Sequence, residues 1–516
     1  MNSDRDLPVD LEREIVAFLS SHALPGPVTR VDTHGARVFI GREETLKIKR
    51  PVRYAYMDFS TMERRRLACE REYELGRGLA PALYLGVVRI TREKDGSLAL
   101  DGEGEVIEHA VRLKTFDPKE GLDRIAAREQ LPDQLSIALG DAVADAHEKA
   151  EPRQGGRSIV EVRDRLLASV DARRFELGAT AVDLIVARSL TELARSTSVL
   201  AARRKAGAVK RCHGDMHLAN IVRIDGRPVL FDAIEFDEDL ATIDPLYDLA
   251  FLLMDLVHRG QLRPATLILN RYLWRLGDCA LSDRSWDALA ALPLMICLRA
   301  LVRAVVGVDR ARDLSGEARD AVLADARAYL DTANRVSKPL PPLLVAIGGL
   351  SGTGKSTVSA CLAPGLGAMP GAIHLRSDLE RKGLAGIEPE ARLGPAGYTE
   401  ELTRHTYQLV FEKARRALAA GHAVIADAVF ARADERAAIE SVASGVGVPF
   451  HGFWLTVPPE LARSRIQHRS GDASDATVDV FERQQKMPTG RVDWTSIDAS
   501  GAADAIAARI RLLVGA

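Results

Sequence analysis

One ten-residue run constrains the fold of this chain more than any other feature. The segment GGLSGTGKST occupies residues 348–357 and directly follows an apolar run at residues 343–347. The spacing Gly-x-x-x-x-Gly-Lys-Ser requires a strand, a tight loop and a helix that begins near the lysine, because the glycines turn backbone N–H groups toward one anion. This unit predicts an α/β domain with a parallel sheet and helices on both faces.

The lysine and serine that close this run add chemistry to the loop. The Lys355 ammonium can reach the β and γ phosphates of ATP, and the Ser356 hydroxyl can bind Mg²⁺. A Gly-rich structural turn is the alternative, but the preceding apolar strand favours a nucleotide site. The residues expected to contact the nucleotide are Gly349, Leu350, Ser351, Gly352, Thr353, Gly354, Lys355, Ser356 and Thr357.

Further apolar runs alternate with helix-compatible segments after this loop, and two of them end in an aspartate. Asp427 ends AVIAD and is expected to support the magnesium ion or its waters, with a solvated strand end as the alternative. Asp378 in HLRSDLERK can accept a proton from a substrate hydroxyl, with helix capping as an equal alternative. The runs expected to form strands are residues 343–347, 372–375, 423–426 and 449–456.

Arginines at helical spacing follow in LARSRIQHRS. Arg463, Arg465 and Arg469 are expected to close over the phosphates as a lid, with Arg463 and Arg469 as the catalytic candidates. An ordinary exposed helix surface is the alternative. From residue 343 onward the chain resembles small P-loop kinases related to gluconate, shikimate and polynucleotide kinases and zeta-type toxins, grouped with AAA-like ATPases. The resemblance implies that Lys355, Ser356, Asp378, Asp427 and these arginines serve phosphoryl transfer to an acceptor.

A second, unrelated phosphate-handling motif lies earlier, in HGDMHLANIV at residues 213–222. Asp215 can deprotonate an acceptor hydroxyl, Asn220 can hold a metal ion, and His213 can support the loop. Asp232 follows the apolar run RPVLF and is placed to bind Mg²⁺ at the nucleotide phosphates. An ordered set of base, amide and metal carboxylate predicts a second kinase site.

The first 336 residues begin with short strand-like runs and continue with mostly helical periodicity, an order typical of a bilobal, protein-kinase-like fold. With HGD, the asparagine, the strand ending in Asp232 and then DPLYDLAFLL, this region resembles the aminoglycoside phosphotransferase family over residues 28–336. The resemblance implies that Asp215 is the base, that Asn220 and Asp232 hold magnesium, and that Asp248 anchors the catalytic loop.

The nucleotide lysine of this region is expected in TLKIKRPV. Lys47 and Lys49 alternate onto one face of a strand, so periodicity does not separate them, and the resemblance favours Lys47. Its partner is expected to be Glu72, with Glu70 as the alternative. No GxGxxG precedes the lysine, so the phosphate cover is expected to be a short turn around His34.

An acidic run, EFDEDLATID, follows the second metal aspartate at residues 235–244. If its carboxylates face the acceptor, they favour cationic acceptors such as amino sugars or aminoglycosides. A solvated loop is the favoured alternative.

Composition and linker signals complete the organisation. The proline-rich SKPLPP at residues 337–342 predicts a stiff connector between a domain at 1–336 and a domain at 343–516. The 70 Lys and Arg nearly balance 72 Asp and Glu, which disfavours nucleic acid as a partner. Five scattered cysteines and a polar N-terminus indicate the cytoplasm. Apolar stretches at 246–257 and 288–308 are too short or too charged to predict membrane insertion.

These observations predict a two-domain, ATP- and Mg²⁺-dependent kinase of mixed α/β and α+β class. Each domain is expected to phosphorylate a hydroxyl of a small molecule such as a sugar, amino sugar or aminoglycoside. One alternative makes the P-loop domain a nucleotide-binding regulator of a single N-terminal kinase. Another makes it a kinase of nucleic-acid ends, against which the absence of basic, aromatic-rich stretches counts. The oligomeric state is left open.

Overall fold

The computed structural model describes residues 8–54, 57–277, 286–389, 391–468 and 473–515. The chain forms two compact units, each assembled from separate stretches of sequence. Unit 1 comprises Met1–Leu131, Asp145–Arg157 and Val209–Asp248. Unit 2 comprises Pro132–Ala144, Ser158–Ala208 and Leu249–Ala516. Unit 2 therefore includes residues on both sides of the proline-rich segment, and the domain boundary at 337–342 stays a prediction.

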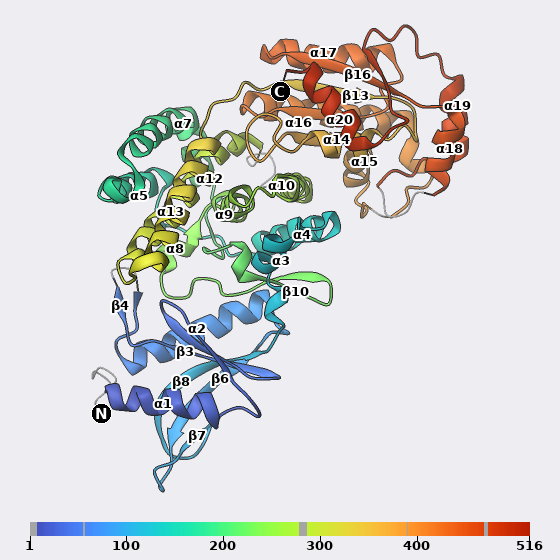
Figure 1. Ribbon diagram of the computed structural model, residues 1–516. Coiled ribbons are helices and arrows are strands. Elements are labelled where there is room, and N and C mark those ends of the chain that lie inside the picture. The colour runs from blue at the N-terminus through green and yellow to red at the C-terminus, as the bar shows by residue number, and fades with distance from the viewer. Residues whose placement is uncertain (1–7, 55–56, 278–285, 390, 469–472, 516) are drawn as a thin grey trace. The chain divides into compact units, whose positions relative to one another are not determined.

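Unit 1 is built on a six-stranded antiparallel sheet with the order β1-β2-β3-β8-β6-β7 (Figure 1). Alternating side chains of the central strands, such as Phe39, Leu46 and Ile90, are buried against Ile15 and Leu19 of the first helix. Helix α2 Met62–Leu79 packs against β8 and β6. The strands are β1 Thr29–Asp32, β2 Ala36–Ile40, β3 Glu44–Lys49, β6 Tyr84–Arg92, β7 Leu98–Leu100 and β8 Glu105–Lys114.

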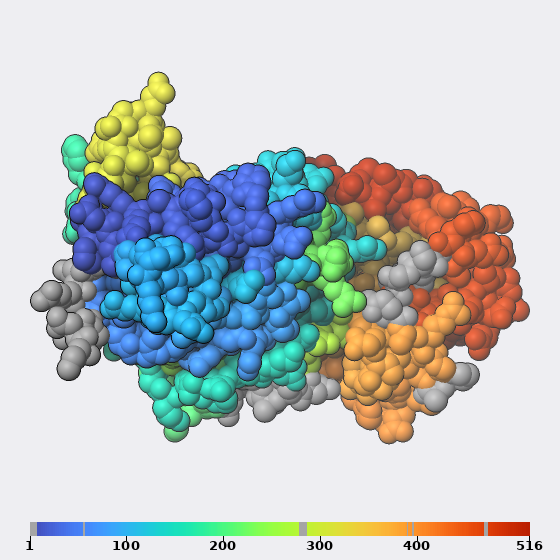
Figure 2. Space-filling model, turned by 90° about the horizontal axis from the view of Figure 1, so that it is seen from below, coloured from blue at the N-terminus to red at the C-terminus, as the bar shows by residue number. Residues whose placement is uncertain are grey.

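The turn between β6 and β7 is exposed at residues 94–97, and Figure 2 shows this part of the chain in light blue on the surface. A later hairpin joins β10 to β11 through Asp225 and Gly226, both at positive φ, as a tight two-residue turn requires. The remaining elements of unit 1 are α1 Val9–Ser21, β4 Arg53–Tyr54, β5 Met57–Asp58, η1 Pro118–Glu120, α3 Leu122–Arg128, β9 Lys210–Arg211, η2 Leu218–Asn220, β10 Ile221–Ile224, β11 Arg227–Leu230, α8 Glu238–Ala241 and β12 Thr242–Ile243. Helices α4 Asp133–Lys149 and α9 Pro245–His258 contribute residues to both units.

The helical part of unit 2 centres on an antiparallel-packed pair, α12 and α13. Among the described residues, one stretch, Trp286–Ala311, is long and apolar enough to cross a bilayer. The sequence instead predicts no membrane insertion here, because of the arginines in this stretch. Two thirds of its most apolar window is buried inside the protein, as in a core helix. The helices here are α5 Ile159–Asp171, α6 Arg174–Leu177, α7 Ala179–Lys205, α10 Leu262–Leu276, η3 Leu289–Ala291, α12 Leu292–Ala311 and α13 Gly316–Val336.

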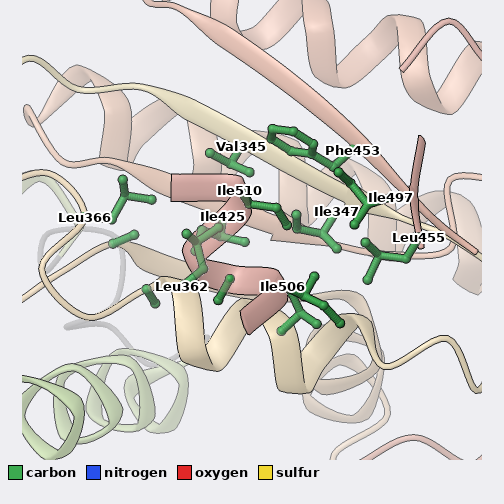
Figure 3. Packing of buried hydrophobic residues seen from close by; sticks show 14 of the residues in the cluster. Val345, Ile347, Leu362, Leu366, Ile425, Phe453, Leu455, Ile497, Ile506 and Ile510 are labelled. Carbon is green, nitrogen blue, oxygen red and sulfur yellow. The ribbon is translucent and has the colours of Figure 1, made fainter. Parts of the chain in front are cut away.

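The rest of unit 2 is a five-stranded parallel sheet with helices, which confirms the predicted α/β architecture. The strand order β14-β15-β13-β16-β17 puts β13 at the centre, and its Val345 and Ile347 lie in a buried apolar cluster with Ile425, Phe453 and Ile510 (Figure 3). Four strands lie within one residue of the predicted runs, and β17 was not predicted. The strands are β13 Leu344–Gly348, β14 Ile373–Arg376, β15 Val424–Asp427, β16 Phe450–Thr456 and β17 Thr495–Asp498.

The helices around this sheet begin with α14, which follows the glycine-rich loop. Because the chain leaves β13 toward β15 on one side and later returns to β16 on the other, the loop after β13 lies at the topological switch point, where such sheets bind ligands. The helices are α14 Lys355–Leu362, α15 Ser377–Leu384, η4 Pro395–Tyr398, α16 Glu400–Ala419, α17 Ala433–Val446, α18 Pro459–Gln467, α19 Val478–Lys486 and α20 Ala503–Leu513.

Candidate active sites

A buried carboxylate fixes the catalytic loop of unit 1. Both side-chain oxygens of Asp248, which is fully buried, accept backbone hydrogen bonds, from His213 N at 3.0 Å and from Gly214 N at 2.9 Å. Gly214 has a φ of 85°, a left-handed conformation that favours glycine. The start of the HGD motif is thereby held in one conformation, the anchoring role that the family resemblance implied for Asp248.

His213 supports the same loop from its ring. Burial lowers its pKa despite the nearby Asp248 carboxylate, so the ring is neutral at physiological pH. Its Nε2 lies 2.8 Å from the carbonyl oxygen of Phe231, and Asp215 N donates to Nδ1 at 3.3 Å. The carbonyl can only accept, which assigns the proton to Nε2 and leaves Nδ1 as the acceptor.

The structure brings the candidate base and one candidate metal ligand together. Asn220 Nδ2 donates to the backbone oxygen of Asp215 at 2.9 Å and to its carboxylate Oδ2 at 3.0 Å. The Asp215 side chain is 38% exposed, whereas Asn220 is buried. A carboxylate held at the surface by an amide is oriented for a proton from a bound hydroxyl.

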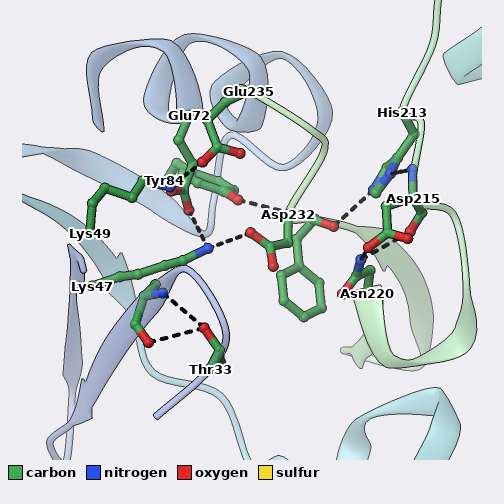
Figure 4. A network of polar contacts seen from close by, with 12 residues as sticks. Thr33, Lys47, Lys49, Glu72, Tyr84, His213, Asp215, Asn220, Asp232 and Glu235 are labelled. Atoms are coloured by element: carbon green, nitrogen blue, oxygen red, sulfur yellow. Dashed lines mark hydrogen bonds and ion pairs between the residues drawn. The ribbon is translucent and has the colours of Figure 1, made fainter. Parts of the chain in front are cut away.

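Lys47 lies between Glu72 and Asp232, two further residues predicted for this site (Figure 4). Its Nζ is 2.9 Å from Glu72 Oε1 and forms an ion pair with Asp232. Asp232 follows β11 with a φ of 61°, and its backbone N donates to the Tyr84 hydroxyl at 3.1 Å. Burial would raise the pKa of Glu72, but the two lysine ammonium groups outweigh it and lower that pKa.

Lys49 occupies a different position from Lys47, although both belong to the same face of β3. Its Nζ lies 2.5 Å from Glu72 Oε2 and pairs with Glu235, and its side chain is only 2% exposed. Lys47 therefore borders Asp232, while Lys49 is buried behind Glu72. Glu70 instead pairs with Arg66 along the exposed side of α2 at 2.6 Å.

Two carboxylates of the acidic run after Asp232 pair with basic side chains of unit 1, and a third caps a helix. Glu235 pairs with buried Lys49, and Glu238 lies 2.8 Å from Arg71 Nη2. Asp237 caps α8 by accepting from the backbone N of Asp239 at 2.9 Å. Glu235 therefore belongs neither to a surface for cationic acceptors nor to a solvated loop, because its carboxylate is buried against Lys49. The sequence did not reveal this partner, because the two residues lie far apart in the chain.

In unit 2 the glycine-rich loop follows β13 and ends at α14, as predicted. Gly349 has a φ of 141°, and a Cβ there would lie 2.7 Å from the Leu455 carbonyl oxygen; Gly354, with a φ of 86°, precedes the first residue of α14. Lys355 Nζ donates to Leu350 O at 3.1 Å. Residues 351–357 line a cavity of about 1380 Å³, whereas Gly349 and Leu350, also expected to contact the nucleotide, are not among its lining residues.

Two carboxylates whose pKa values are shifted in opposite directions line this cavity. Asp427 ends β15 with 4% of its side chain exposed, 3.3 Å from His374 Nε2. Burial opposes its ionisation, but His374, Arg376 and Lys355 outweigh burial and lower its pKa. Burial raises the pKa of Asp378 and exceeds the opposing effect of Lys355 and Arg376. The pKa values of these two carboxyl groups are therefore shifted in opposite directions, a pattern that distinguishes groups with different roles at catalytic sites.

Asp378 does not cap its helix. The residue that precedes α15 is Arg376, and no side chain accepts a capping hydrogen bond there. The Asp378 carboxylate instead interacts with the Ser474 side chain, from the segment before α19. Capping was the alternative for this residue, and the structure does not give it that contact.

Two of the predicted lid arginines, Arg463 and Arg465, have different surroundings in the structure. Arg465 lines the cavity, donating to Thr353 O at 3.4 Å and to Ala499 O at 3.0 Å. Arg463, a catalytic candidate, is not among the lining residues; its Nε lies 3.5 Å from Glu482, because this position faces α19. Arg469 lies outside the described residues. The sequence reading missed Gln484 and Arg376, although Arg376 stands two residues before Asp378.

Comparison with known families defines the class of both halves. Residues 42–292 match the phosphotransferase enzyme family, and residues 344–488 match the AAA domain. The chain therefore carries a phosphotransferase-family domain followed by a P-loop kinase-like domain, and it is an enzyme of the kinase class.

Several known proteins align with this chain along most of their own length. Uncharacterized proteins from Mycobacterium tuberculosis and Mycobacterium bovis are 28% identical over 495 residues, which cover 91% of this chain and 92% of theirs. A choline/ethanolamine kinase family protein from Mesorhizobium loti aligns with 63% of this chain and 99% of its own, at 14% identity and a TM-score of 0.38. A gluconokinase from Sinorhizobium meliloti aligns with 34% of this chain and 98% of its own, at 20% identity and a TM-score of 0.23.

Proposed function

We propose that the phosphotransferase domain transfers the γ-phosphoryl group of ATP to a hydroxyl of a small molecule. The acceptor oxygen forms a bond to the γ-phosphorus, the bond from that phosphorus to the β,γ-bridging oxygen breaks, and ADP leaves. Asp215 takes the hydroxyl proton. Lys47, held by Glu72, binds the nucleotide phosphates.

The same site suits magnesium by its donor chemistry. Asn220 and Asp232 offer amide and carboxylate oxygens, the hard ligands that Mg²⁺ takes. The ion pair between Asp232 and Lys47 supports this proposal, because it brings the carboxylate next to the lysine proposed to bind the phosphates. When bound, magnesium supplies positive charge that stabilises the phosphates during transfer.

We infer that the P-loop domain is a second phosphotransferase rather than only a nucleotide-binding regulator. The observation that carries this inference is Asp378, a carboxylate with a raised pKa in the cavity that also contains Lys355. A module that only binds nucleotide has no need of a proton acceptor there. Ser356 and Asp427 offer oxygen ligands for magnesium, and Asp378 takes the acceptor proton.

The acceptors proposed for both sites are small hydroxyl compounds such as sugars, amino sugars or aminoglycoside-like molecules, and the proposed location is the cytoplasm, where ATP is available. ATP consumption measured over a panel of these compounds tests the proposal, with wild type, Asp215→Ala and Lys355→Ala compared. Each substitution should remove activity toward one set of acceptors. Activity that survives in both variants would refute the site assignments.

The same panel separates the alternatives. If Lys355→Ala changes only the rate of the Asp215-dependent reaction, the P-loop domain is a regulator. Phosphorylation of 5′-hydroxyl oligonucleotides by wild type but not by Lys355→Ala would instead favour a nucleic-acid end kinase.

A further inference from the structure

Helix α19 inserts a side chain into the glycine-rich loop. The backbone N–H of Ser351 donates to Gln484 Oε1 at 2.8 Å, and both residues line the cavity that contains Lys355. In loops of this type the backbone N–H groups are the donors for nucleotide phosphates. A neutral carboxamide oxygen therefore binds a donor of the kind that phosphate oxygens use.

The position of Gln484 is built into the packing of unit 2. Phe481, one turn earlier on α19, is buried in an apolar cluster with Ala462 and Ile466 of α18. Leu350 of the glycine-rich loop packs against the same cluster. Residues three apart lie on the same side of a helix, so the anchoring of Phe481 also directs Gln484 toward the loop.

The segment that leads into α19 also contacts the acceptor side of the cavity. Ser474 interacts with Asp378, and Asp475 lies 3.1 Å from Lys382 Nζ on the same helix as Asp378. One short stretch of chain therefore contacts both the proton acceptor and the loop. Gln484 and Asp378 both line the cavity, and a transferred phosphoryl group has to lie between the nucleotide-binding loop and the proton acceptor.

The chemistry of glutamine suits recognition of that group. Its carboxamide has an accepting oxygen and a donating nitrogen on one rotatable group. A phosphate oxygen competes with Oε1 for the Ser351 N–H, and rotation of the carboxamide then presents Nε2–H to the same oxygen. An ionised glutamate at this position has no donor and would repel the phosphate.

We propose that Gln484 recognises the terminal phosphate of ATP, so that the P-loop site distinguishes the triphosphate from ADP. This inference rests on the proposed nucleotide-binding function of the P-loop domain. It assigns α19 a direct part in substrate discrimination and adds Gln484 to the residues that contact the nucleotide.

The test measures binding of ADP and of adenylyl-imidodiphosphate, a non-hydrolysable ATP analogue, by calorimetry. The full-length chain carries Lys47→Ala and Asp232→Ala in all samples, so that binding reports the P-loop site. Gln484→Glu should weaken binding of the analogue at least tenfold and that of ADP less than threefold. Gln485→Glu is the matched control, because it adds the same charge to an exposed neighbour on α19, and both affinities should stay within twofold.

Equal weakening of both ligands by Gln484→Glu, or no weakening, would overturn the proposal. Gln484→Met, which keeps the size of the side chain, guards against misfolding and should lower the preference for the analogue over ADP severalfold; an unchanged preference would also overturn it. Lys355→Ala tests the underlying function separately. If that variant binds both ligands as before, the proposed nucleotide site itself is wrong.

Discussion

Lys49 offers a quantitative test of the buried ion-pair network in unit 1. Its side chain is 2% exposed, and its partners Glu72 and Glu235 are 1% and 6% exposed. Replacing Lys49 by methionine fills the space but leaves two buried carboxylates with a single lysine. Removal of one partner from a buried pair costs about 3–5 kcal/mol. For a unit of this size the thermal midpoint should fall by roughly 6–20 °C.

The assay can follow the two units separately. All four tryptophans follow residue 248, so their fluorescence monitors unit 2, while circular dichroism follows unfolding of the whole chain. Lys49→Met should lower the transition seen by circular dichroism and leave the fluorescence transition in place. Lys94→Met, at the exposed β6–β7 turn, is the control and should change stability by less than about 0.5 kcal/mol.

The pH dependence of stability provides a second, independent test of this prediction. Burial raises the pKa of Glu235, and Lys49 opposes that shift, so Glu235 should titrate at still higher pH in the variant. A carboxyl whose pKa is higher in the folded state stabilises the fold when protonated, and this contribution is lost as pH rises. The deficit of Lys49→Met should therefore shrink from pH 7 to pH 5. A deficit below about 1 kcal/mol, or one independent of pH, would refute the network reasoning.

Three further predictions concern the reactions. Asp248→Asn should lower kcat of the Asp215-dependent transfer about a hundredfold, because an amide cannot accept from both loop N–H groups; unchanged kcat would contradict the anchoring role. The Lys355-dependent transfer should be lost as pH falls through a pKa above the ordinary aspartate value, because burial raises the pKa of Asp378; a pH–rate profile without this limb would contradict that role. Arg465→Ala should reduce this transfer at least tenfold and Arg463→Ala less than twofold, as measured by steady-state kinetics, and the reverse order would restore the lid assignment of Arg463.

Local motifs allowed much of this arrangement to be predicted. The glycine-rich loop after an apolar run predicted the parallel sheet, and the HGD motif with Asp232 predicted the kinase-like fold; both fold classes are confirmed. These predictions succeed because strand, loop and helix are encoded within about 20 residues, and phosphate-binding loops tolerate few alternatives.

Contacts between segments that lie far apart in the sequence could not be predicted from local motifs. Lys47 and Lys49 share a strand face, and only the packing of α2 and the chain after Asp232 distinguishes their surroundings. The sequence around Gln484 is typical of an exposed polar helix, since α19 has Phe481 as its one buried residue. The contact of Gln484 with the glycine-rich loop therefore could not be predicted. Strand β17 escaped notice because three of its four residues are exposed and no apolar run marks it.

The central position of β13 has a consequence for biosynthesis. Leu344 pairs with Val424 on β15 and with Phe450 on β16, so both edges of β13 wait for partners made much later in the chain. Pairings this distant in sequence form slowly. The glycine-rich loop therefore cannot be fixed until the ribosome has released β16, whereas every segment of unit 1 has been synthesised by residue 248. During translation, the chain that carries Lys47, Asp215 and Asp232 is therefore complete before any strand of the parallel sheet has been made.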